Sequence, residues 1–312
     1  MKKVIQRMRI VCMACLVFWA VSPSLSETAQ TEESANTITA ISYNVMYFHG
    51  FPPDRVSLQG TPDHEAEKEI VQRVRKQIPT RIALELELYA PDIISLQEAR
   101  GEGNVKAIAE QLGMNYVFFP PSGRANFPGA IITRYEILES QSRPVVDGEC
   151  PPDLFTRHWG RALLQTEIGT IAVHTAHLWP FGERGAERRS REISEMLKAI
   201  KGDMEAGHTI LLMGDLNHSQ HASEYERWVE LGLIDTWAKA NEGKTGFTVR
   251  STGPRPGMED HRIDYIWVDE ELANKLVHSR ILYEGAFKTH EDTPTSFALS
   301  DHIPVLSIFQ LP

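Results

Sequence analysis

In the segment ILLMGDLNHS at 210–219, two polar residues follow a short apolar run. They are Asp215 and Asn217, with one residue between them. The run 210–213 predicts a short buried strand, and Gly214 then breaks the apolar run. On an extended backbone residues i and i+2 point to the same side, so Asp215 and Asn217 would stand side by side at the end of a sheet. A carboxylate can orient or deprotonate a water, and an amide can donate to a phosphate oxygen. The alternative is an Asx turn that only ends the strand.

Further polar residues fall in or at the ends of other predicted strands: Asn44, Glu98, His177, Asp264, Asp301 and His302. Each has an ordinary structural explanation by itself. Asp264 is the hardest to explain in that way, because a carboxylate inside the apolar segment RIDYIWV is costly to bury unless it is paired. Together, hard oxygen ligands and two histidines suit Mg²⁺ or a similar cation acting on phosphate.

Strands and helices that could position these residues interleave along the chain. Apolar and β-branched patterns predict strands at 37–45, 92–97, 116–119, 130–133, 161–167, 170–177, 210–213, 262–268 and 304–309. Helical patterns occupy 103–112, 187–201 and 223–231, and another helix after Asp63 should break near Pro79 and stop before Pro91. Several neighbouring strands look hairpin-linked, so the sheet should be mixed.

The order of the motifs SYNV, LQE, HTAHL, GDLN, RIDYIWV and SDH resembles the endonuclease/exonuclease/phosphatase superfamily. That superfamily includes deoxyribonucleases, abasic-site endonucleases, neutral sphingomyelinases and inositol-polyphosphate phosphatases, and the resemblance covers about residues 38–311. It implies an α+β fold, a four-layer α/β sandwich in which two mixed β-sheets pack face to face with helices on the outside.

The resemblance implies a metal site. Glu98 is expected to be the principal metal ligand, with Asn44 and Asp301 completing or supporting the site, and the ion is expected to be Mg²⁺ or Mn²⁺. Arg161, at the start of a predicted strand, either adds positive charge there or lies at the surface.

The resemblance also implies catalytic roles. Asp215 should orient or activate the attacking water, and Asn217 should contact the phosphate. His302 resembles the catalytic histidine, with Asp264 as its carboxylate partner, and His177 resembles a second phosphate-binding histidine. The chemistry agrees, because a carboxylate orients an imidazole and favours its charged form, which stabilises a phosphorane-like anion.

The first 26 residues are typical of a secretory signal peptide. Four basic residues precede a run of twelve apolar residues at 10–21, and the small residues SLS at 24–26 suit a cleavage site. Twelve residues are too few to cross a bilayer core of roughly 30 Å, so we expect no permanent membrane anchor. We therefore expect an exported protein, periplasmic or secreted, with a disordered lead-in at 27–36 and a catalytic domain at 37–312.

Loss of those four basic residues would change the formal charge from −10 to −14. Such acidity disfavours a non-specific nucleic-acid binder, although a nuclease could supply metal ions locally. Cys150 would remain as a single cysteine, so the exported fold would have no internal disulfide. The long Gly/Pro-rich loop 47–63, with Trp179 and Phe181, is expected to border the cleft and narrow it toward small substrates.

We interpret the chain as an exported, monomeric, metal-dependent phosphoesterase that cleaves P–O bonds, chiefly of phosphodiesters, by direct attack of water. A DNA or RNA endonuclease and a sphingomyelinase-like lipid phosphodiesterase are alternatives within the enzyme class, because specificity resides in loops on a shared scaffold. A catalytically silent binding protein is the alternative of a different class. Such a protein would be expected to lack Glu98, Asp215 or His302, and all three are present.

Overall fold

The computed structural model describes residues 36–50, 64–121, 127–142, 154–180, 183–249, 262–287 and 298–312, with the backbone alone at 64–72, 74–75 and 183–184. All of these lie in the compact unit Ala35–Pro312. The expected signal peptide, the lead-in up to residue 35, positions 51–63 of the long loop, Cys150 and Phe181 lie outside the described residues. No helix in the described part of the chain is both long and apolar enough to span a membrane.

Two six-stranded sheets form the centre of the fold. The first contains β1 (Thr37–Asn44), β2 (Ile93–Gln97), β3 (Asn115–Phe119), β4 (Gly129–Thr133), β11 (Leu276–Ile281) and β12 (Val305–Gln310). The second contains β5 (Glu136–Ser142), β6 (His158–Thr166), β7 (Gly169–His177), β8 (Thr209–Asp215), β9 (Ile234–Asp235) and β10 (Asp264–Val268). The strand orders are β11-β12-β1-β2-β4-β3 and β5-β6-β7-β8-β10-β9. β1 and β2 are parallel, as are β7 and β8, and antiparallel neighbours flank both pairs, so both sheets are mixed as predicted.

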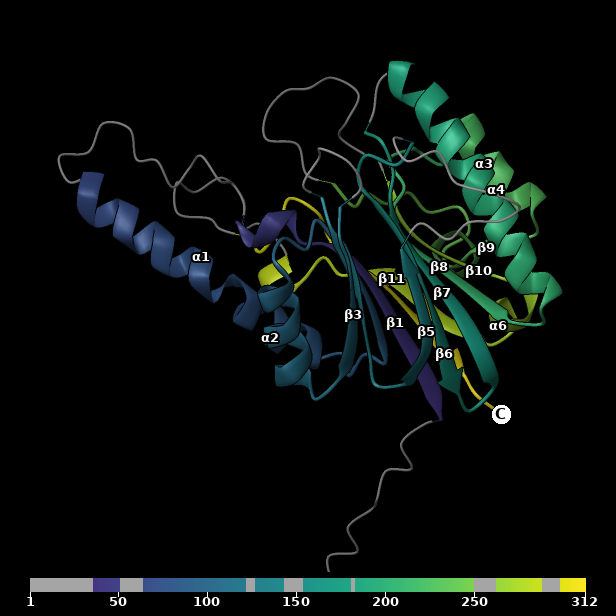
Figure 1. Ribbon diagram of the computed structural model, residues 1–312, viewed down its shortest axis with the longest axis horizontal. Coiled ribbons are helices and arrows are strands. Elements are labelled where there is room, and N and C mark those ends of the chain that lie inside the picture. Colours follow the sequence, from purple (N-terminus) through teal and green to yellow (C-terminus); the bar gives the residue numbers. More distant parts are fainter. Residues whose placement is uncertain are drawn as a thin grey trace, which may run out of the picture. The chain divides into compact units, whose positions relative to one another are not determined.

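The four longer helices cover the outer faces of the two sheets. The helices are α1 (His64–Glu87), α2 (Glu102–Leu112), α3 (Glu183–Glu205), α4 (Ser223–Glu230), α5 (Thr236–Ala240) and α6 (Glu270–Ala273), and the short turns are η1 (Met46–Phe48) and η2 (Gly285–Phe287). The short helices α5 and α6 instead add their buried residues to the cluster between the sheets. Figure 1 shows α1 and α2 on one side of the sheets and α3 and α4 on the other. The buried apolar residues form one cluster between the sheets and one under each helical layer, which confirms the predicted four-layer α/β sandwich.

Alternate side chains of β8 pack on its two faces, one against the other sheet and one against the helices. Leu211 and Met213 belong to the cluster between the sheets, whereas Ile210 and Leu212 pack under α3 and α4. Because strand side chains alternate with a period of two, the next residue of the inner set is Asp215. This carboxylate therefore faces the other sheet, at the end of the apolar cluster between the sheets.

One expected feature is wrong. α1 continues from His64 to Glu87 with Pro79 inside it, so it does not break there. Proline removes one backbone donor and strains the preceding turn. The buried side chains Ile78, Ile82 and Leu86 lie on one face of the helix and pack on the first sheet, which compensates for that cost.

Candidate active site

The ends of β7, β8 and β10 bring three of the predicted residues into one row. His177 pairs in register with Asp215 across the parallel β7–β8 ladder, and Asp264 pairs with Asp215 across the antiparallel β8–β10 ladder. Gly214 allows the close approach of β7 and β8, because a Cβ atom there would lie 2.0 Å from the carbonyl oxygen of Ala176. All three polar residues are almost completely buried.

Asp215 is the centre of the cluster. Its Oδ2 accepts a hydrogen bond of 3.0 Å from Nδ2 of Asn44, which lies at the end of β1 in the opposite sheet. The same oxygen lies 3.2 Å from Nε2 of His177 and 3.8 Å from Nε2 of His302. One carboxylate oxygen thus faces groups that come from both sheets.

His302 and Asp264 form the predicted pair. Nδ1 of His302 lies 2.9 Å from Oδ2 of Asp264, which leaves Nε2 directed toward Asp215. The backbone around His302 is fixed as well, since its N–H donates to Oγ of Ser300 at 3.2 Å and that hydroxyl donates to the carbonyl oxygen of Asn44 at 2.7 Å.

The two histidines differ in charge. Burial opposes a charge on His302, but the carboxylates of Asp264, Asp215 and Asp301 outweigh it and raise the pKa of His302 well above its usual value. Burial raises the pKa of Asp264 to about 6, and His302 opposes that rise. At neutral pH the pair is therefore an imidazolium and a carboxylate. By contrast, burial and the charges of Arg157 and His302 hold the pKa of His177 well below its usual value, so His177 is neutral.

The residues expected to hold a metal lie beside this cluster. Oε1 of Glu98 is 3.4 Å from Nδ2 of Asn44 and 3.9 Å from Nε2 of His177. Burial raises the pKa of Glu98 to about 7, and the carboxylates of Asp301 and Asp215 add to the rise. Glu98 and Asp301 are therefore close enough to repel each other, and their oxygens form a hard donor set that a divalent cation would neutralise.

Asn217 departs from the expected geometry. β8 ends at Asp215, so the extended backbone that would align the two side chains does not reach Asn217. The Asn217 N–H donates to Oδ1 of Asp215 at 3.2 Å, as in an Asx turn, and its Nδ2 donates to the carbonyl oxygen of Leu178 at 3.0 Å. Asn217 thus ties the segment after His177 to the Asp215 loop.

Left-handed backbone conformations concentrate around the site. Glu98 and Asn217 both have φ of 54°, and the three residues of η1 have φ between 44° and 60°. Such conformations cost roughly 1–3 kcal/mol each for residues other than glycine and occur mostly at functional sites. The η1 turn is tied to the site because the Tyr47 N–H donates to the carbonyl oxygen of Glu98 at 3.1 Å.

Asp215, Asp264 and His302 also have ligand atoms within 4.8 Å of one another. A cation bound by all three would have to displace the proton that His302 shares with Asp264, and a charged imidazolium cannot bind a metal. The hydrogen-bond donors to Glu98 and Asp301 are neutral, namely Nδ2 of Asn44 at 3.4 Å and Oγ of Ser300 at 3.3 Å. Glu98 and Asp301 therefore form the better candidate metal site.

Arg161 fits neither of its two expected roles, because it lies away from the site and is buried rather than at the surface. It is buried on the other face of β6, where Nε donates to both carboxylate oxygens of Asp203 at 2.9 and 3.0 Å. His174 also contacts Asp203, at 2.9 Å, and therefore faces α3. Sequence reasoning missed Arg157, which contacts His177 directly. No local pattern distinguishes Arg157 from Arg161, because the contact depends on how two strands meet.

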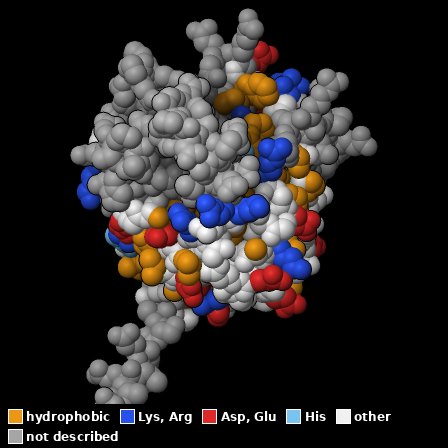
Figure 2. Space-filling model, turned by 90° about the vertical axis from the view of Figure 1, so that its left-hand side faces the viewer, with side chains coloured by type: hydrophobic (Ala, Val, Ile, Leu, Met, Phe, Trp, Pro, Cys, Tyr) orange, Lys and Arg blue, Asp and Glu red, His pale blue; other side chains and the backbone are white. Residues whose placement is uncertain are grey.

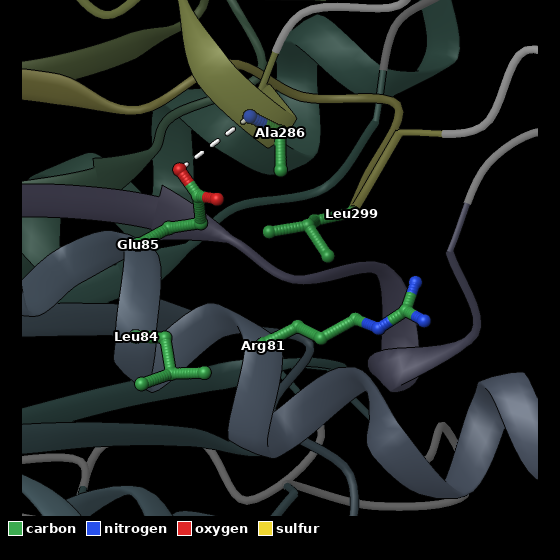
Figure 3. Close-up of a pocket in the computed structure, with 5 residues that line it drawn as sticks. All are labelled: Arg81, Leu84, Glu85, Ala286 and Leu299. Atoms are coloured by element: carbon green, nitrogen blue, oxygen red, sulfur yellow. Dashed lines mark hydrogen bonds between the residues drawn. The ribbon is translucent and has the colours of Figure 1, made fainter.

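A separate pocket of about 310 Å³ contains none of these residues. It is lined by Arg81, Leu84, Glu85, Ala286 and Leu299. Figure 3 shows Glu85 reaching from α1 to the backbone N–H of Ala286, which donates to its carboxylate at 3.5 Å. This pocket lies where α1 packs outside the first sheet, whereas the polar cluster lies between the two sheets.

The family model for the endonuclease/exonuclease/phosphatase family matches residues 41–302, which include every residue of the cluster. The chain belongs to this family. Its members hydrolyse phosphoesters, so the prediction of a phosphoric-ester hydrolase is confirmed at that level.

Individual relatives are distant. Exodeoxyribonuclease III of Haemophilus influenzae is 24% identical over 272 residues, which cover 74% of this chain and 95% of that protein. A mannosyl-6-phosphatase of Bacteroides thetaiotaomicron has a TM-score of 0.61 at 20% identity, over 86% of this chain and 98% of that one. An AP endonuclease of Archaeoglobus fulgidus has a TM-score of 0.58 at 17% identity, over 88% and 100%. At such identities the structures show the shared fold.

Asp264→Asn and His302→Gln should each lower kcat by about 10²–10⁴, as expected for the loss of a charged catalytic group. If the residues act as a unit, the double variant should be scarcely worse than either single variant. Asp264→Asn also removes the main group that raises the pKa of His302, so the alkaline limb of the kcat profile should move to lower pH.

The matched control is His174→Gln, which breaks an equally buried His–Asp pair on the opposite face of the sheet and should keep kcat near wild type. Multiplicative losses in the double variant would show that Asp264 and His302 act independently.

Proposed function

We propose that this chain is an exported, divalent-metal-dependent phosphoesterase in which water attacks phosphorus directly. The observation that carries the proposal is the convergence of Asn44, His177 and His302 on one carboxylate oxygen of Asp215, between two sheets. A binding protein without catalysis would have no need for this arrangement of opposed charges, which is costly to bury.

The chain's own residues account for the proton and charge chemistry. Asp215 is an acceptor that can hold and orient the attacking water. His302 is charged, so its Nε2 can donate to a phosphate oxygen and stabilise the negative charge that develops there. Asp264 keeps that imidazole oriented through the 2.9 Å contact to Nδ1.

Glu98, Asp301 and Asn44 are the residues that would hold Mg²⁺ or Mn²⁺. The buried, mutually repelling carboxylates of Glu98 and Asp301 fit such an ion. A divalent cation bound there would polarise the phosphate and offset its charge. Phosphodiesters are the substrate class that we propose first.

A nuclease is the second candidate, because the relative exodeoxyribonuclease III matches most of the chain. The formal charge of −10 disfavours a long polyanion. The negative charge is not spread evenly over the surface, since Figure 2 shows a short band of Lys and Arg side chains on one face. A sphingomyelinase-like activity has no such supporting observation.

Activity should disappear in excess chelator and return with Mg²⁺ or Mn²⁺. The substrate panel should contain a small phosphodiester, DNA, RNA and sphingomyelin. We expect the small phosphodiester to be hydrolysed most efficiently, and Glu98→Ala to abolish metal-restored activity while the folded state persists by circular dichroism. Full activity in excess chelator would overturn the proposal.

Export rests on the basic start and apolar run of residues 1–26. Expression of the full chain in a bacterium should yield a mature protein that begins at Glu27, detected by mass spectrometry of the periplasmic or culture fraction. An uncleaved chain that stays in the cytoplasm would contradict export without affecting the catalytic proposal.

A further inference from the structure

His158 reaches from the second sheet to the first beside the polar cluster. It is the first residue of β6, its side chain is buried, and it pairs in register with His177 of β7. Its ring lies against the backbone of Gly129 in β4, because a Cβ atom on Gly129 would overlap Nε2 of His158. A residue larger than glycine at this point of the first sheet would displace the imidazole.

The hydrogen bonds of His158 have a fixed direction. Burial and the charges of His177 and Arg157 lower the pKa of His158 to about 3, so the ring is neutral and carries one proton. Nδ1 lies 3.3 Å from the carbonyl oxygen of Phe127, which can only accept, so the proton is on Nδ1. Nε2 is therefore an acceptor, and the hydroxyl of Thr175, at 3.3 Å, donates to it.

The series of donors continues from Thr175 into the first sheet. Since the hydroxyl hydrogen of Thr175 is used on His158, Oγ1 of Thr175 accepts from the hydroxyl of Ser95 at 2.7 Å. Oγ of Ser95 in turn accepts from Nε2 of Gln97 at 2.7 Å. Gln97 is the last residue of β2 and directly precedes Glu98. One arm of His158 thus ends on the residue before the proposed metal ligand.

The other arm of His158 reaches the residue after Glu98. Phe127, which accepts from Nδ1, precedes Pro128, and the carbonyl oxygen of Pro128 accepts a hydrogen bond of 3.0 Å from the N–H of Ala99. The two arms therefore hold the chain on both sides of Glu98. Glu98 has a φ of 54°, and left-handed residues other than glycine persist only where the surrounding structure fixes them.

We propose that His158 is a positioning residue for Glu98 and holds the Glu98 carboxylate ready to bind a divalent cation. This inference rests on the proposed function, because it needs the metal site that Glu98 would form. His158 does not bind the ion itself, since the carbonyl oxygen of Phe127 and the hydroxyl of Thr175 engage both of its ring nitrogens. Loss of a group that orients metal ligands through hydrogen bonds typically lowers metal affinity by about 10–100-fold.

Mn²⁺ binding, measured by isothermal titration calorimetry at pH 8, tests the proposal without an assay of activity. Thr175→Val removes the hydroxyl that joins the two sheets and should raise the dissociation constant for Mn²⁺ about tenfold. Thr175→Ser keeps the hydroxyl and should bind Mn²⁺ as the wild type does. His158→Leu removes both arms, so its dissociation constant should rise more than that of Thr175→Val, within the range of about 10–100-fold.

A double-variant cycle tests whether the first arm is continuous. Ser95→Ala breaks the same arm as Thr175→Val, so the double variant should bind Mn²⁺ no more weakly than either single variant. Multiplicative losses would show that the two hydroxyls act separately, which would overturn the continuous arm on which the proposal depends.

Thr236→Val is the matched control. Oγ1 of Thr236 lies 2.8 Å from Oγ of Ser307 in β12 of the first sheet, and both residues are fully buried. Ser307 pairs in register with Ala40, which precedes Asn44 by four residues along β1, so this contact lies away from the proposed metal site. Thr236→Val should lower the urea midpoint of unfolding as Thr175→Val does, while Mn²⁺ binding stays unchanged. Equal weakening of Mn²⁺ binding in the two variants would indicate a general loosening and would overturn the proposal.

Two further outcomes would overturn the proposal and leave the proposed function intact. In one, the wild type binds Mn²⁺ and Thr175→Val and His158→Leu bind it equally well. In the other, Thr175→Ser loses as much affinity as Thr175→Val, so the hydroxyl is not the cause. The two Thr175 variants decide the question alone where His158→Leu does not fold. A wild-type protein that binds no Mn²⁺ would instead contradict the metal site of the proposed function.

Discussion

The site depends on the burial of several carboxylates between two sheets. Asp215 and Asp264 are almost completely buried, and the side chain of Glu98 is only 14% exposed. Taking like charges out of water together is unfavourable unless cations accompany them. The fold supplies part of the compensation through His302, whose pKa is raised by the carboxylates around it. Glu98 and Asp301 remain less well compensated, and this imbalance is why a metal ion suits the site.

The sheets create this imbalance through strand alternation. Residues that face the other sheet are apolar in the middle of each strand and become polar at one end. In the first sheet Ile38 and Ala40 pack between the sheets, and Asn44 follows in the same phase. Between the apolar residues and the polar cluster, Oγ of Ser95 lies 2.7 Å from Oγ1 of Thr175 in the opposite sheet. This contact marks the change from apolar to polar side chains between the sheets. The apolar part fixes the distance between the sheets, and the polar end uses that fixed distance for chemistry.

Much of this could be predicted from the sequence, because strand periodicity is local. Alternating or continuous apolar runs identified the strands that carry Asn44, His177, Asp215 and Asp264. The edge strands β5 and β11 were missed, since β5 is largely exposed and polar and β11 is irregular near Leu276 and His278, so neither shows a clear pattern. The helix break expected near Pro79 is wrong although the local signal is strong, because the packing of α1 on the sheet outweighs the effect of the proline.

Contacts between distant strands were harder to foresee. The pairing of Asp264 with His302 followed from the family resemblance, and the structure shows the contact. The position of Arg157 beside His177 depends on the segment before β6 meeting the end of β7, for which one sequence holds no signal. Asn217 was placed in the right loop, but its conformation follows from the left-handed turn after Asp215.

The central claim is that the Glu98 carboxylate is buried in order to hold a divalent cation, and metal-linked stability tests it without an assay of activity. Mn²⁺ at about 100 times its dissociation constant should raise the melting temperature of the wild-type protein by roughly 5 °C. Glu98→Gln should abolish this rise. Glu192→Gln should keep it, although burial raises the pKa of Glu192 to about 7 as well. A rise of the same size in Glu98→Gln, or none in the wild type, would contradict the account.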